Sequence, residues 1–132
     1  MAALASVPPH TPTFILSYPE KYILVVTINR PSVMNSIPKS GHWEAHQLFT
    51  WFDNEPTLRV AIITGAGEKA FCAGQDLIEL GGSKSNIDLP PCVPAHPPEG
   101  FAGLSRRVGK KPVIAAVNGF ALGGGFEICL NW

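Results

Sequence analysis

The pattern of apolar residues begins with two short runs separated by a turn. Phe14–Leu16 and Tyr22–Ile28 are apolar, and the sequence Tyr18-Pro19-Glu20 lies between them. The second run is rich in β-branched residues, which favour extended backbone. Two such runs joined by a proline-containing turn predict a β-hairpin. Residues 1–13 contain several prolines and no such pattern, so we expect a flexible arm there.

A helical pattern follows a segment that contains Pro31 and Pro38. We expect a helix from about Ser40 to Asn54, because Ser40 can cap its start and Pro56 follows its end. Its predicted apolar face is irregular and consists of Trp43, Leu48, Trp51 and Phe52.

Strand and helix patterns alternate through the rest of the chain. Residues 58–64 (LRVAIIT) and 111–119 (KPVIAAVNG) predict two buried strands. A short helix is expected near Asp76, an amphipathic helix over 99–110 and a final helix after the glycines at 123–125. Residues 81–98 contain five prolines and predict a long loop. This alternation predicts an α/β fold.

The overall charge is balanced. Ten Lys and Arg residues offset ten Asp and Glu residues, and hydrophobic residues make up 45% of the 132 positions. A net charge of zero gives no electrostatic basis for binding nucleic acid or an anionic membrane surface, so we expect neither partner. The sequence also lacks a run of about 18 apolar residues, the length that would predict a membrane span.

Cysteine and histidine spacing predicts neither disulfides nor a metal site. Cys72, Cys92 and Cys129 are widely spaced and odd in number, as is typical of an intracellular, reduced protein. His42 and His46 are four residues apart but lack an HExxH context, so we expect them to be core or surface residues. The first residues do not have the character of a signal or transit peptide.

One glycine motif has two interpretations. The sequence GAGEKA (65–70) matches G-x-G-x-x-G/A after an apolar strand, the pattern of a dinucleotide-binding turn. That turn requires a continuous helix starting inside the motif. Here Ala73-Gly74 and Gly81-Gly82 interrupt the sequence soon afterwards. A dinucleotide-binding half-domain is therefore an alternative that the sequence disfavours.

Two other glycine-rich loops carry the candidate chemistry. FCAGQDL (71–77) and GFALGGGFE (119–127) each follow a predicted strand and open a predicted helix. Glycine lets the backbone approach a ligand closely, and the first amides of a helix are unpaired and partly positive. Two such loops aimed at one point would bind the oxyanion that develops on a carbonyl oxygen. Glu127, in the first turn of the final helix, would then act as a general acid or base.

These segments resemble the crotonase (enoyl-CoA hydratase/isomerase) superfamily. The likeness is carried by ILVVTINRP with MNS, then LRVAIITGAGEKAFCAGQDL, then KKPVIAAVNGFALGGGFEI, in this order and spacing. The resemblance implies a spiral of ββα units and an acyl-CoA thioester substrate that reacts through an enolate. It implies no metal and no separate cofactor, because coenzyme A is part of the substrate. Full-length members usually form homotrimers.

The resemblance also implies roles for individual residues. The backbone amides of Gln75 and Gly124 would form the oxyanion hole, and Glu127 would be one of two acid/base glutamates of the hydratases. Gln75 stands where the family commonly has a smaller residue. Coenzyme A would be contacted mainly through backbone groups, at Met34, Asn35, Ser36, Ala73, Gln75, Asp76, Leu77 and Gly124.

The final segment departs from the family pattern. The second glutamate and the C-terminal helices of the family come later than Trp132, and the last predicted helix is apolar on nearly every face. We therefore expect residues 14–132 to be the N-terminal portion of a truncated crotonase-like domain. Two functions stay open, an acyl-CoA hydratase or isomerase and a catalytically inactive fragment. Some family members carry peroxisomal signals, so the expected location is intracellular, either cytoplasmic or peroxisomal.

Overall fold

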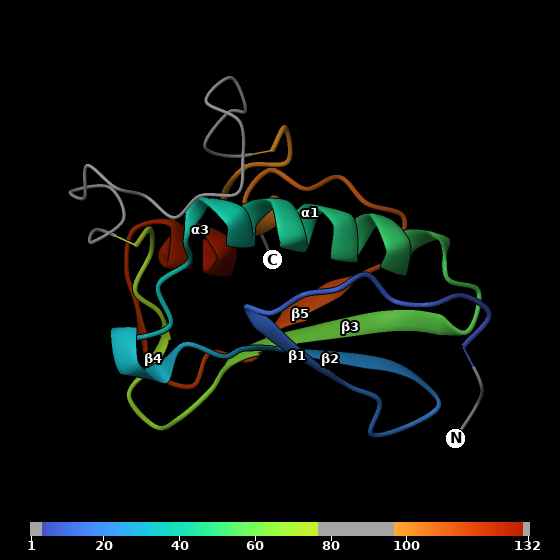
Figure 1. Ribbon diagram of the computed structural model, residues 1–132, viewed down its shortest axis with the longest axis horizontal. Helices are drawn as coiled ribbons and strands as arrows, with labels where there is room; N and C mark the ends of the chain where they lie inside the picture. Colours follow the sequence, from blue (N-terminus) through green and yellow to red (C-terminus); the bar gives the residue numbers. More distant parts are fainter. Residues whose placement is uncertain (1–3, 77–96, 131–132) are drawn as a thin grey trace.

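The main sheet has four strands in the order β1-β2-β3-β5. The computed structural model describes residues 4–76 and 97–130. β1 (Phe14–Ser17) pairs antiparallel with β2 (Tyr22–Ile28), which confirms the predicted hairpin. β2, β3 (Leu58–Gly65) and β5 (Val113–Ala115) run parallel, as Figure 1 shows. The predicted α/β fold is confirmed.

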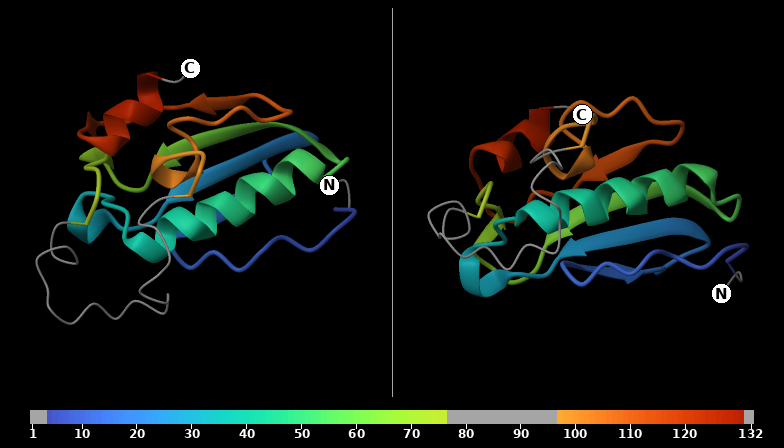
Figure 2. Two further views of the ribbon diagram at one scale, coloured as in Figure 1. Left: turned by 90° about the horizontal axis from the view of Figure 1, so that it is seen from above. Right: turned by 45° about the horizontal axis from the view of Figure 1, so that its top comes forward.

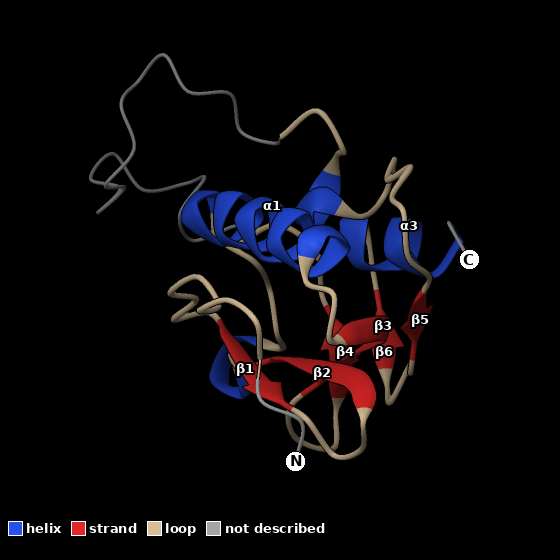
Figure 3. Cartoon of the chain, turned by 90° about the vertical axis from the view of Figure 1, so that its right-hand side faces the viewer, coloured by secondary structure: helices blue, strands red, loops and turns tan. Residues whose placement is uncertain are grey.

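Helix α1 (Lys39–Asn54) connects β2 to β3 and covers one face of the sheet, so that helices and strands form two layers (Figure 3). Parallel neighbours require such a crossover. The helix begins after Pro38, without the side-chain cap predicted for Ser40. Its buried residues recur every three or four positions, whereas Trp43 and Trp51 lie beside this stripe and are half-buried. The buried set is Gly41, His42, Ala45, Leu48, Phe49 and Phe52.

The core lies between α1 and the sheet. Alternate residues of β2 and β3 point toward the helix, as period-two strands require. Their side chains are fully buried together with those of the helix, and the set includes Leu24, Val26, Ile28, Ala61, Ile63, Leu48 and Phe52. Each large side chain in this set contributes about 1.5–3 kcal/mol of burial free energy, which makes this layer the main source of stability.

β4 (Ala70–Cys72) and β6 (Phe120–Ala121) form a second, parallel two-stranded sheet. The glycines of the GAGEKA motif make the turn from β3 into β4. A Cβ atom at Gly65 would lie 2.5 Å from the carbonyl oxygen of Phe71, and Gly67 has a φ of +82°. The chain then continues as a strand, so these described residues lack the helix that a dinucleotide-binding turn requires.

The prediction of a helix over residues 99–110 is wrong. The structure has only a short 3-10 helix there, η2 (Phe101–Gly103), followed by a turn. Gly100, Ala102 and Gly103 have φ values of +86°, +54° and +63°, and right-handed helical backbone cannot continue through such residues. The amphipathic pattern of residues 99–110 therefore does not form a helix, because the backbone takes a left-handed turn at these three residues.

The strand predicted over residues 111–119 is shorter than expected. β5 ends at Ala115, and residues 116–119 lead into β6 without strand pairing. The short helix predicted near Asp76 and most of the proline loop at 81–98 lie outside the described residues.

Part of the segment predicted to be a flexible arm contacts the rest of the protein. The backbone amides of Ala5 and Ser6 each donate a hydrogen bond of 2.9 Å to the carboxylate of Glu55. Thr11 and Thr13 are buried further along this segment. The two hydrogen bonds tie residues 5 and 6 to Glu55, the residue that follows α1, and the flexibility expected for residues 1–13 stays a prediction.

The last helix, α3 (Gly124–Leu130), lies beside β4, opposite the N-terminus (Figure 2). The short 3-10 helix η1 (Pro31–Val33) also lies at this edge, where the parallel strands β2 and β3 end (Figure 1). Within residues 4–76 and 97–130, no helix has the length and apolar character needed to cross a bilayer.

Candidate oxyanion-binding site

The two glycine-rich loops lie at the carboxyl edge of the parallel strands, where α/β sheets usually bind ligands (Figure 1). One loop follows β4 and contains Gly74 and Gln75. The other follows β6 and contains the glycines at 123–125. A hydrogen bond of 3.0 Å from the Leu122 amide to the Cys72 carbonyl joins the two loops.

Gly74 and Gly124 are direct neighbours in space. A Cβ atom at Gly74 would lie 3.0 Å from the carbonyl oxygen of Leu122 and 3.6 Å from the backbone nitrogen of Gly124. Gly74 also has a φ of +98°, which glycine adopts at little cost. The convergence of the two loops is therefore a feature of the structure, although they are about fifty residues apart in the sequence.

Backbone pairing sets the direction of the Gln75 amide. Ile37 forms a parallel bridge with Gln75, in which the Ile37 amide donates to the Gly74 carbonyl at 2.9 Å. In a trans peptide the N–H points opposite to the C=O. The Gln75 N–H therefore points away from Ile37. That the Gln75 and Gly124 amides bind the same oxyanion stays a prediction.

The start of α3 presents backbone amides on the second loop. The Gly125 amide donates to the Leu122 carbonyl at 2.9 Å, and the Glu127 amide donates to the Gly123 carbonyl at 3.1 Å. Among the described residues, no backbone carbonyl accepts a hydrogen bond from the Gly124 amide. This is the donor that the sequence predicted for the oxyanion hole.

Two of the three consecutive glycines are required by close contacts. A Cβ atom at Gly124 would lie 2.2 Å from Cδ2 of Phe101, and one at Gly125 would lie 2.2 Å from the Cys72 carbonyl oxygen. Gly123 has open space around it but a φ of +54°. The glycine run therefore lets α3 dock directly against β4 and η2.

His42 connects the first loop to η2. Its Nε2 lies 2.6 Å from Oε1 of Gln75, and its Nδ1 accepts a hydrogen bond of 2.9 Å from the Ala102 amide. Because Nδ1 is an acceptor, the imidazole is neutral and its proton is on Nε2, which donates to Gln75. The ring also contacts Phe101 edge-on, with a centroid distance of 4.5 Å.

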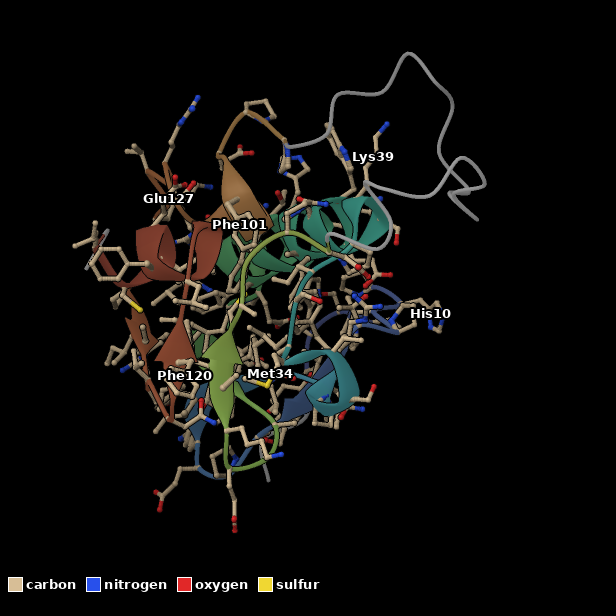
Figure 4. The ribbon with its side chains drawn as sticks, turned by 90° about the vertical axis from the view of Figure 1, so that its left-hand side faces the viewer. His10, Met34, Lys39, Phe101, Phe120 and Glu127 are labelled. Carbon is tan, nitrogen blue, oxygen red and sulfur yellow. The ribbon has the colours of Figure 1, made fainter. Side chains whose placement is uncertain are left out.

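Glu127 lies near Phe101 and projects from α3 into solvent (Figure 4). It borders an open cavity of about 330 Å³ together with Ser105, Arg106 and Leu130. Its carboxylate is therefore reachable by water and by a ligand, as a general acid or base requires.

Hydrogen bonds from side chains hold the predicted coenzyme A loop. Met34 and Asn35 both have a φ of +57°. The Asn35 side chain is fully buried, and its Nδ2 donates to the carbonyls of Ala66 and Ala70 at 2.9 and 2.8 Å. The Ser36 carbonyl accepts a hydrogen bond of 2.8 Å from Arg30. The Asn35 side chain therefore holds the loop, and ligand contact falls to neighbouring groups.

Met34 lies at the same end of the molecule as Phe101 and Glu127 (Figure 4). It borders a cavity of about 320 Å³ that is also lined by Pro31, Asn35 and residues 66–70. The lining includes Lys69, an exposed cation that can contact a phosphate.

Other predicted contacts have structural partners. Asp76 forms an ion pair of 3.0 Å with Arg30, and its amide donates to the Ile37 carbonyl at 3.1 Å. The Ala73 amide donates to the Met34 carbonyl at 3.1 Å, which joins the first glycine loop to the Met34 loop. Leu77 lies outside the described residues.

Cys72, beneath the two loops, is not an activated nucleophile. Burial raises the pKa of its thiol to about 11, despite an opposing hydrogen bond with the Gly74 backbone. The thiol is therefore protonated at neutral pH. In the part of the chain that the structure describes, no three His, Cys, Asp or Glu side chains gather as a metal site would require.

His42 and Phe101 were not identified as site residues from the sequence. Both occur in segments with ordinary core patterns, and His42 fits the buried stripe of α1. Only their position relative to Gln75 and Gly124 indicates a role at the site.

Comparison with known proteins gives consistent results. A family model described as "Enoyl-CoA hydratase/isomerase" matches residues 19–131. A mevalonyl-coenzyme A hydratase of Beauveria bassiana is 47% identical and aligns with 93% of this chain and 45% of its own length. A carnitinyl-CoA dehydratase of Escherichia coli is 47% identical over 110 residues, which cover 82% of this chain and 39% of that protein.

A solved structure has the same arrangement of elements. The structure of a carnitinyl-CoA dehydratase from Mycobacterium avium 104 superposes with a TM-score of 0.75 at 37% identity, over 91% of this chain and 44% of that chain. The present chain therefore spans less than half the length of the relatives it matches.

Proposed function

Because this chain belongs to the enoyl-CoA hydratase/isomerase family, we propose that it binds the thioester carbonyl of an acyl-CoA and stabilises the enolate of that thioester. The observation that carries this proposal is the contact between the two glycine loops at Gly74 and Gly124. A pair of backbone amides from these loops, those of Gln75 and Gly124, would donate to the thioester oxygen. Each such donor contributes roughly 3–4 kcal/mol of transition-state stabilisation.

The proton chemistry is assigned to Glu127. Addition of water across a 2-enoyl thioester forms a C–O bond at C3 and a C–H bond at C2, with negative charge on the thioester oxygen in between. A carboxylate beside the anion-binding loops can accept a proton from water or deliver one to carbon. The exposure of Glu127 beside an open cavity supports this assignment.

The nucleotide end of coenzyme A is assigned to the Met34 loop. Its neighbouring cavity has space for part of the coenzyme A moiety of the substrate, and Lys69 supplies a positive charge for a phosphate. The Asn35 side chain is buried and bonded within the protein, which favours recognition through backbone groups of this loop. The named relatives are a hydratase and dehydratases of acyl-CoA compounds, which favours hydration or dehydration over double-bond migration.

Acetoacetyl-CoA tests the anion-binding part of the proposal, because its enolate has a distinct near-ultraviolet absorbance. The purified 132-residue chain is expected to bind this thioester and raise the enolate fraction at neutral pH. Gly124→Ala is expected to abolish the signal, since a Cβ atom there would collide with Phe101. Circular dichroism checks that the variant is folded. Absence of both binding and enolate signal in the unaltered chain would refute the proposal.

Crotonyl-CoA hydration tests the role of Glu127. Glu127→Gln is expected to reduce turnover by about 100-fold or more, because it removes the titrating carboxyl group. Its effect on the acetoacetyl-CoA enolate signal is expected to be small. A hydration rate equal to that of the unaltered chain would remove Glu127 from the mechanism.

A second candidate function is acyl-CoA binding without turnover. The described residues that line the Glu127 cavity, Ser105, Arg106 and Leu130, provide no second carboxylate. An enolate signal with acetoacetyl-CoA but no hydration of crotonyl-CoA would favour this candidate over the hydratase.

A further inference from the structure

We propose that His42 is a positioning residue that holds both halves of the anion-binding site in register. This inference rests on the proposed function, since it concerns the same two loops. His42 lies on α1, is fully buried and has no direct access to a ligand, so it acts through the residues that it contacts.

The first contact orients Gln75. The Nε2–H group donates to Oε1 of Gln75 at 2.6 Å, while the Ile37 bridge fixes the peptide groups on either side of that residue. Backbone pairing alone would let the direction of the Gln75 amide change whenever the loop moves. Anchoring the side chain to a buried ring restricts movement of the same residue whose amide would bind the oxyanion.

The second contact supports Gly124. The Nδ1 atom accepts a hydrogen bond of 2.9 Å from the Ala102 amide, and the ring touches Phe101 edge-on at 4.5 Å. Phe101 lies against Gly124 so closely that a Cβ atom there would be 2.2 Å from its ring. Movement of His42 would therefore displace the surface on which the second amide rests.

Histidine is suited to this position because its neutral ring carries an acceptor and a donor at two different points of one rigid plane. Asparagine can place an acceptor near the Nδ1 position, and glutamine can place a donor near the Nε2 position, but neither supplies both. Replacing His42 by asparagine therefore breaks the connection to Gln75, and replacing it by glutamine breaks the connection to Ala102. A purely structural core role would need only the volume and burial of the side chain.

The test compares His42→Asn with the unaltered chain. The variant is expected to keep the Ala102 hydrogen bond and lose the one to Gln75. Loss of that bond should weaken enolate formation from acetoacetyl-CoA by about tenfold, the effect of roughly one hydrogen bond to the loop. Binding of free coenzyme A, which has no thioester oxygen, should change by less than about twofold. A loss of enolate formation without a loss of coenzyme A binding indicates a positioning role, because general destabilisation would weaken the binding of both ligands.

Gln75→Met removes the same hydrogen bond by replacing its acceptor, and it retains the backbone amide of residue 75. It is expected to give the same tenfold loss, and the double variant His42→Asn/Gln75→Met should be no weaker than either single variant, because both remove one connection. This variant keeps the proposal testable if His42→Asn fails to fold. His10→Asn, at an exposed histidine of the N-terminal segment, is the matched control and should leave the enolate signal unchanged.

Three outcomes would overturn the inference. A folded Gln75→Met or His42→Asn chain with an unaltered enolate signal would show that the contact does not affect the site. Equal weakening of free coenzyme A and acetoacetyl-CoA would indicate a structural role only. Absence of both acetoacetyl-CoA binding and the enolate signal in the unaltered chain would refute the proposed function itself, and this inference with it.

Discussion

At the scale of single residues, the start of α3 allows almost no side chain. Gly124 faces the Phe101 ring and Gly125 faces the Cys72 carbonyl, in both cases at 2.2 Å from where a Cβ atom would be. Side-chain rotation can relieve the first contact in part, but the second is with the backbone of β4. The close approach of the α3 backbone to the β4 backbone therefore explains why position 125 is a glycine, although its φ does not require one.

Gly125→Ala is expected to destabilise the protein by about 3 kcal/mol, because α3 must move away from β4 to admit the methyl group. Gly67→Ala serves as the comparison, since its Cβ atom would meet only Pro31, at 3.5 Å, and its cost is limited to a positive φ. That cost is about 1–2 kcal/mol. Urea unfolding measures both, and equal losses of stability would contradict the docking argument.

At the scale of elements, a buried carboxylate fastens the N-terminal segment to the end of α1. Burial opposes ionisation of Glu55, but hydrogen bonds from Ser6, Ala5 and Thr57 outweigh it and lower its pKa to about 2. The ordinary value is 4.5. Between these two values the unfolded chain binds more protons than the folded one, so stability falls as the pH falls.

The stabilising contribution of ionised Glu55 is expected to be complete above about pH 4.5 and to be lost as the pH falls toward 2. Glu55→Gln should be less stable than the unaltered chain at pH 7, because its amide group faces donors at Ala5 and Ser6. The difference in urea midpoint between the two proteins should narrow below pH 4.5. A difference that stays constant down to pH 2.5 would argue against this account.

At the scale of the whole molecule, apolar side chains cluster on the surface formed by β5, β6 and α3. Phe120, Phe126 and Leu130 are 63%, 53% and 68% exposed. Ile114 on β5 is also exposed, as are Val117 and Leu122 in the segments that flank β6. Exposed apolar clusters of this kind favour association with other apolar surfaces.

The isolated chain is therefore expected to self-associate at micromolar concentration. Phe126→Ser combined with Leu130→Ser should weaken this association by about tenfold or more, because two apolar side chains are removed from the contact surface. Sedimentation velocity over a range of concentrations measures the effect. Val108→Ser, at a 98% exposed position outside this cluster, is the control and should change little. Association that persists unchanged in the double variant would exclude this surface.

The sequence by itself determined the local elements and the family. The hairpin, α1 and β3 follow from apolar periodicity, and the two glycine loops follow from composition between a strand and a helix, because each of these signals is contained within a few neighbouring residues. The same local reasoning gave a helix over 99–110, where positive φ values at Gly100 and Ala102 prevent one.

Only the tertiary structure decided how distant segments meet. Four contacts join segments 23 to 60 residues apart: Gly74 with Gly124, the Phe101 ring with Gly124, and His42 with Gln75 and with Ala102. Such contacts arise when α1, η2 and α3 pack on the sheet to bury apolar surface, and no local pattern records which polar atoms that packing brings within hydrogen-bonding distance.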